Sequence, residues 1–191
     1  MSETLSQEAV YVLVNLSIQG KQPVWLNGAN LEGLHLGGAN LAEANLASTN
    51  LSGANLKKAV LTAANLEGAH LERANCEGAD LQGANLYTAH LRAAYMYATN
   101  LSEANLGGAN LVGVNLGGAN LEKVNLFRAN LYDTNLTKAN LKKANMRGAN
   151  LSQANLEGAN LTGATYDGDT VWPKNFDPEI SGAEYKWGRI N

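Results

Sequence analysis

The chain has 191 residues and a formal net charge of -3, which is enough for one domain and too short for two ordinary domains with a linker. A charge this close to neutral gives no reason to expect nucleic acid as a ligand. The single cysteine excludes a disulfide framework within the chain and a zinc site built from cysteines.

The first segment, residues 1–23, lacks the repeat that follows it and is predicted to be an N-terminal cap. Thr4 and Gln7 have the spacing of a capping box, and apolar residues then recur at near-helical intervals. We therefore expect a short helix over residues 5–14. The alternative is an irregular strand over residues 10–14, because Val14-Asn15-Leu16 matches the repeat in phase.

No targeting or membrane segment is expected. The start of the chain lacks a basic stretch followed by an apolar core, so it does not have the pattern of a secretory signal. No apolar run approaches the length of about 18 residues that a membrane-spanning helix needs, so we expect no membrane partner. The missing signals and the lone thiol favour a cytoplasmic protein.

The central segment is a repeat of five residues. From residue 26 to residue 161, every fifth position is Leu at 25 of 28 places, and the residue before it is Asn at 21 of them. Successive leucines would be displaced by about 140° around a helix and would alternate between the two faces of a strand. A chain that bends once in every unit would instead point each Leu inward. Gly suits such a bend, because it tolerates positive φ, and it occupies the second position after the Leu in 13 units.

Stacked coils about 4.8 Å apart would bury this apolar column and leave sheet edges exposed only at the two ends. The tandem Ala-Asn-Leu-x-x units, such as Ala39-Asn40-Leu41, resemble the pentapeptide-repeat proteins over residues 24–165. The resemblance implies an all-β fold, a right-handed quadrilateral β-helix with four units in each coil. We therefore expect about seven coils over residues 24–168, in a rod about 34 Å long.

The last segment, residues 169–191, is the predicted C-terminal cap and tail. Tyr166, Val171 and Phe176 keep the five-residue phase with larger side chains, and we expect Trp172 and Phe176 to cover the last coil. In some members of the family, an uncovered aromatic end forms a dimer. The residues after Phe176 leave room to block that end here, so we expect a monomer rather than an end-to-end dimer.

The groups that could carry chemistry are few. His35, His70 and His90 occupy the outward position that Asn usually fills, and the last two would lie on neighbouring coils. His70 and His90, together with Glu72, suggest as an alternative a partial metal or anion site. No further ligand is evident, so we expect no metal and no cofactor. Cys76 replaces an inward Leu, where a thiol is neither accessible nor activated. The sequence contains no G-x-S-x-G motif, P-loop or dinucleotide-binding fingerprint, so it does not indicate an enzyme.

The repeated Asn is expected to be structural, because short amides at strand spacing can hydrogen-bond to turns and to each other.

One coil differs from the others, because it contains no glycine between Gly83 and Gly107. This coil carries exposed aromatic and guanidinium groups, which are enriched at protein interfaces, so it could form a recognition patch. The alternative is that these residues are scattered surface variation without a function. The gap at Gly107, between Tyr87 and Phe127 in one column, is a further place where a partner side chain could fit. The candidate partner patch on this coil consists of Tyr87, His90, Arg92, Tyr95 and Tyr97.

Two functions are consistent with these features. The first is a non-enzymatic scaffold whose flat faces bind a protein partner of unknown identity. The second rests on the resemblance, since some pentapeptide-repeat proteins are rods of DNA-like width and charge that bind DNA gyrase. The outward position here holds Asn 21 times and Asp once, so the surface is not strongly acidic. The scaffold is therefore the preferred prediction.

Overall fold

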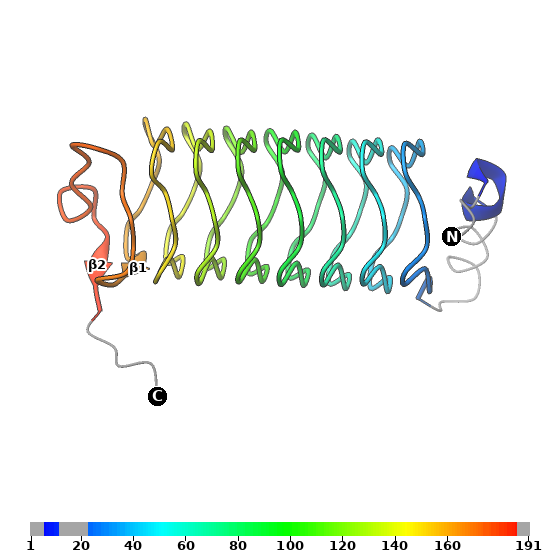
Figure 1. The fold of residues 1–191 in the computed structure, drawn as a ribbon, viewed down its shortest axis with the longest axis horizontal. Coiled ribbons are helices and arrows are strands. Elements are labelled where there is room, and N and C mark those ends of the chain that lie inside the picture. The colour runs from blue at the N-terminus through cyan, green and yellow to red at the C-terminus, as the bar shows by residue number, and fades with distance from the viewer. Residues whose placement is uncertain (1–5, 12–22, 187–191) are drawn as a thin grey trace.

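The computed structural model describes residues 6–11 and 23–186, and most of the second range forms a rod of stacked coils (Figure 1). Parallel β-bridges join outward residues that are 20 positions apart in the sequence, from Trp25 with Asn45 to Asn145 with Thr165. Residues 25 and 165 are thus separated by seven such steps, which span about 34 Å at strand spacing. The predicted stacking, with four units in each coil, is confirmed.

Each five-residue unit makes one side of a coil and ends in a turn. In the first unit the N–H of Ala29 donates to the carbonyl of Leu26 at 2.9 Å, and Gly28 between them has a φ of 68°. This is the pattern of a type II turn, which requires positive φ at its third residue. The same position has positive φ in all 28 units, at 13 glycines and at 15 other residues. The turn position was therefore predicted correctly, but glycine is not required there.

Backbone hydrogen bonds join each coil to the next. The N–H of Leu31 donates to the carbonyl of Asn50 at 2.7 Å, and the N–H of Asn50 donates to the carbonyl of Ala29 at 2.9 Å. The inward leucines are buried throughout the rod, and each contributes about 1.5–3 kcal/mol of apolar burial. Where Thr replaces the inward Ala, its hydroxyl is satisfied, as for Thr99, which donates to the carbonyl of Cys76 at 2.9 Å.

A short helix over residues 7–11 lies at the N-terminal end of the rod (Figure 1). Ser6 is its N-cap, because its hydroxyl accepts a hydrogen bond of 3.1 Å from the N–H three residues later. The predicted capping box is wrong at Gln7, whose amide donates to the carbonyl of His35 and accepts from its N–H, both at 2.7 Å. The side chain of Gln7 thus satisfies both backbone hydrogen-bonding groups of His35 near the N-terminal end of the rod. Thr4 and most of the alternative strand lie outside the described residues.

The regular pairing changes at the C-terminal end. Strand β1 (Thr165–Tyr166) pairs in parallel with β2 (Glu184–Tyr185), and Asn150 pairs with Val171, 21 positions later. One extra residue in the loop between these partners moves Val171 to an outward position, where it is half exposed. The prediction that Val171 keeps the inward phase is therefore wrong, whereas Tyr166 is buried as expected.

Aromatic rings cover the last coil. Trp172 meets Tyr166 edge-on at 5.4 Å and stacks on Phe176 at 5.2 Å, and both Trp172 and Phe176 pack against the core. Tyr185 of β2 meets Tyr166 edge-on at 5.3 Å. The prediction that Trp172 and Phe176 cover this end is confirmed. Within the described ranges, no helix has the length and hydrophobicity that crossing a membrane requires.

Candidate functional site

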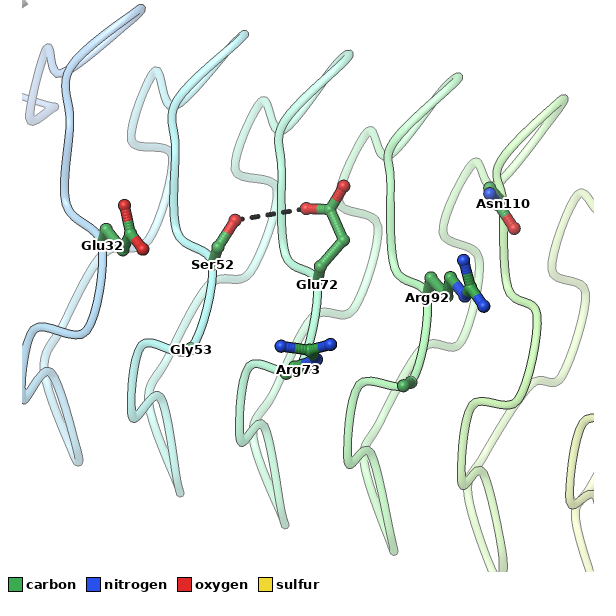
Figure 2. Close-up of a pocket in the computed structure, with 8 residues that line it drawn as sticks. Glu32, Ser52, Gly53, Glu72, Arg73, Arg92 and Asn110 are labelled. Atoms are coloured by element: carbon green, nitrogen blue, oxygen red, sulfur yellow. Dashed lines mark hydrogen bonds between the residues drawn. The ribbon is translucent and has the colours of Figure 1, made fainter.

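A pocket of about 680 Å³ lies along one side of the rod (Figure 2). Glu32, Ser52, Glu72 and Arg92 hold the same position in four successive coils, so their side chains form a row along this side. The Ser52 hydroxyl donates to Oε2 of Glu72 at 3.3 Å, which orients that carboxylate. With Arg73, the pocket contains two carboxylates and two guanidinium groups, so it suits a polar ligand rather than an apolar one.

Two imidazole rings adjoin this pocket through Glu72. His70 and His90 are bridge partners on neighbouring coils, and their rings stack with centroids 4.7 Å apart and planes 4° from parallel. Nδ1 of His70 lies 3.4 Å from Oε1 of Glu72. One ligand atom from each of the three groups lies within 4.8 Å of the others. The sequence predicted the neighbouring histidines, but it did not indicate how close the carboxylate of Glu72 comes to them.

The residues of the predicted partner patch are divided among three sides of the coil. Tyr87 lies on one side, His90 and Arg92 on the next, and Tyr95 and Tyr97 on the third. Because a coil has four sides, Tyr87 and the Tyr95–Tyr97 pair face opposite directions. The structure brings Tyr95 and Tyr97 together, with ring centroids 6.4 Å apart, and leaves both exposed. A flat partner could contact this pair or Tyr87, but not both.

The suggested gap at Gly107 is occupied by the protein itself. A Cβ added to Gly107 would lie 3.2 Å from Cδ2 of Tyr87, so the tyrosine ring already covers this glycine. Gly117 and Tyr97 repeat the arrangement on the opposite side, with a corresponding distance of 3.3 Å. Both glycines therefore act as platforms for exposed rings, and the space between Tyr87 and Phe127 is not free for a partner side chain.

The asparagines have the structural role that was predicted. Nδ2 of Asn105 donates to Oδ1 of Asn85 at 3.2 Å, and Nδ2 of Asn125 donates to Oδ1 of Asn105 at 2.9 Å. Oδ1 of Asn105 also accepts from the N–H of Gly107 at 3.2 Å. Each such amide thus links neighbouring coils and supports the bend of its own unit.

Cys76 is unsuited to nucleophilic chemistry, as the sequence predicted. Its side chain is fully buried, and this burial raises the pKa of the thiol to about 12. A thiol must lose its proton and be reached by a substrate to act as a nucleophile. Cys76 meets neither condition, so it serves as a small apolar group in the core.

The chain matches a family model described as pentapeptide repeats in 8 copies, over residues 26–62, 59–96, 89–126 and 129–165. No curated protein matches it. Among solved structures, the pentapeptide repeat protein alr5209 from Nostoc PCC 7120 is 38% identical, with 56% of this chain and 84% of that chain covered and a TM-score of 0.40.

Two further structures resemble the chain. HetL, a pentapeptide repeat protein involved in heterocyst differentiation regulation in Nostoc sp. strain PCC 7120, is 31% identical, with 73% of this chain and 77% of that chain covered and a TM-score of 0.27. QnrB1, a plasmid-mediated fluoroquinolone resistance protein, is 17% identical in its trypsin-treated form, with coverage of 85% and 82% and a TM-score of 0.62, which shows a common fold alone. The family match and the coil geometry together mean that this chain is a right-handed β-helical solenoid and belongs to the pentapeptide-repeat family.

Proposed function

We propose that the chain is a non-enzymatic scaffold that binds a protein partner on one outer side of its solenoid. The observation that carries this proposal is the Tyr95–Tyr97 pair, whose residues are 40% and 48% exposed and whose rings lie 6.4 Å apart on one side. Tyrosine has few rotatable bonds, so an ordered ring loses little freedom on binding, and aromatic residues are enriched at interfaces.

The rest of the rod supports a binding role. Leucine and alanine side chains fill the interior, and the outward positions can vary without disturbing it. The tail also covers the C-terminal end, since β2 pairs with β1 and Tyr185 lies against Tyr166. Because the tail blocks the surface that an end-to-end dimer would use, we propose that the protein is a monomer. We also propose a cytoplasmic location.

The alternative, a DNA mimic that binds DNA gyrase, has less support from the surface. A DNA mimic needs a row of unpaired negative charges spaced like phosphates. Here Lys57 pairs with Glu77 and Lys123 pairs with Glu103, both at 2.8 Å between neighbouring coils. The outward position before each inward residue holds Asn at 21 of 28 places and a carboxylate only at Asp80. We therefore expect DNA supercoiling by gyrase to be unaffected by an excess of the protein.

Affinity capture with matched variants tests the scaffold. We expect the wild-type protein to capture a defined partner from the lysate of its own cells, and a Tyr95→Ala, Tyr97→Ala double variant to lose it. Tyr87→Ala is the control, because Tyr87 is 48% exposed but lies on the opposite side. Retention of the same partner by the double variant, with all three proteins equally folded by circular dichroism, would contradict the proposed surface.

A further inference from the structure

We propose that His70, His90 and Glu72 form a binding site for a divalent transition-metal ion. The three side chains come from two neighbouring coils, and one ligand atom of each lies within 4.8 Å of the others. Two imidazoles and one carboxylate are a ligand set that suits Zn²⁺ and Cu²⁺. The site lies on a different side of the coil from the Tyr95–Tyr97 pair, so it stands independently of the proposed scaffold function.

The backbone holds the two histidines in register. His70 and His90 are parallel bridge partners. The N–H of His90 donates to the carbonyl of Ala69 at 2.9 Å, and the N–H of Leu71 donates to the carbonyl of His90 at 2.7 Å. The coils therefore cannot separate without breaking the hydrogen bonds of the solenoid. A metal site on such a frame loses less conformational freedom on binding than one built on loops.

The spacing of the ligand atoms fits one ion after a small movement. Two atoms bound to a tetrahedral Zn²⁺ at about 2.1 Å lie about 3.4 Å apart. Oε1 of Glu72 and Nδ1 of His70 already have this separation, at 3.4 Å. Since one ligand atom from each residue lies within 4.8 Å of the other two, no separation in that set has to close by more than about 1.4 Å. Because the imidazole planes are nearly parallel, the rings must turn toward the ion, and the terminal torsion of an exposed histidine is soft.

Neighbouring groups define how the site would work. The Ser52 hydroxyl donates to Oε2 of Glu72 and leaves Oε1 for the ion (Figure 2), as a second-layer partner does in known metal sites. Water would complete the coordination, as in zinc sites with three protein ligands. Arg73 and Arg92 face the same pocket and repel a cation, so we expect micromolar rather than nanomolar affinity.

The untagged protein offers a direct test, because it has only three histidines. Zn²⁺ is titrated while the imidazole proton signals are followed by NMR, and the signals are assigned from the His70→Asn and His90→Asn variants. These variants introduce the residue that the repeat normally carries, so they are expected to fold. We expect saturation at one equivalent, with the signals of His70 and His90 shifting and that of His35 unchanged. Absence of saturable binding at micromolar Zn²⁺, or equal shifts of all three signals, would overturn the site.

Calorimetry on variants provides the second measurement. Removing a group that hydrogen-bonds to a metal ligand lowers metal affinity about 10–100-fold, and removing a ligand itself should cost at least as much. We therefore expect His70→Asn and His90→Asn each to weaken Zn²⁺ binding at least tenfold. Glu72→Gln should also weaken it, Ser52→Ala should weaken it less, and His35→Asn should leave it unchanged. Cu²⁺ should bind more tightly than Zn²⁺, and Mg²⁺ should not compete. Unchanged affinity in both histidine variants, or a loss in His35→Asn, would refute the assignment.

Discussion

Each unit has a turn residue with positive φ, so exchanging glycine for alanine there should lower stability and the reverse exchange should raise it. Gly113 has a φ of 67°, and a Cβ added there would meet nothing within 4 Å, so Gly113→Ala changes the backbone strain and little else. Left-handed backbone costs an L-residue about 1–2 kcal/mol, and loss of glycine's freedom in the unfolded chain returns about 0.4–1 kcal/mol. We expect a net loss of about 1 kcal/mol, which lowers Tm by about 2–4 °C in a chain of this length.

Ala98 provides the reverse experiment, because it has a φ of 53° and is exposed. Ala98→Gly should stabilise the protein by about 1 kcal/mol, although glycine usually destabilises regular structure. Gly37→Ala is the matched control, because the φ of Gly37 is not positive and the added Cβ would make an ordinary contact of 3.5 Å with the carbonyl oxygen of Lys57. Thermal and urea unfolding would be followed by circular dichroism. Equal effects of Gly113→Ala and Gly37→Ala, or a less stable Ala98→Gly, would refute the reasoning.

Cys76 should resist a thiol reagent in the folded protein at mildly alkaline pH and react fully in denaturant, because burial raises the pKa of its thiol to about 12. An absorbance assay for free thiols measures this reaction, and rapid labelling of the folded protein would contradict the prediction. Asp167→Asn should lower Tm at neutral pH. Burial alone would raise the pKa of Asp167, but hydrogen bonds, first among them that from the N–H of Gly148, lower it. The stability that Asp167 supplies is therefore present above its unfolded pKa of about 3.9 and is lost as pH falls through the lower folded value, so the difference in Tm should close in acid. Asn105→Ala should cost about 1–3 kcal/mol in urea unfolding, because it removes the ladder bond to Asn85 and leaves the N–H of Gly107 without its acceptor.

The regular part of the fold could be predicted from the sequence because one local pattern recurs in every unit. An inward Leu, a small residue two positions earlier and a bend at a fixed position leave few ways to bury the apolar column. The ends could be predicted only in part, because each contains contacts that have no counterpart elsewhere in the chain. The pairing of Gln7 with the backbone of His35 and the shift of Val171 by one residue are both of this kind. The sequence located the turn position, but it did not indicate that non-glycine residues there, such as Lys58, have the same positive φ, because the stacked coils impose a conformation that local preference disfavours.

The candidate sites show why sequence neighbours are a poor guide to function in a solenoid. Residues five positions apart turn to different sides of the coil, whereas residues 20 positions apart are hydrogen-bonded partners on the same side. The predicted patch followed one coil, so it combined Tyr87 with Tyr97, which face opposite directions. The groups that do converge, His70 and His90, are separated by one full coil, and Glu72 reaches them from the next outward position. Because a ligand or a partner meets one side at a time, recognition sites in this protein should follow the columns along the rod and not the course of the chain around it.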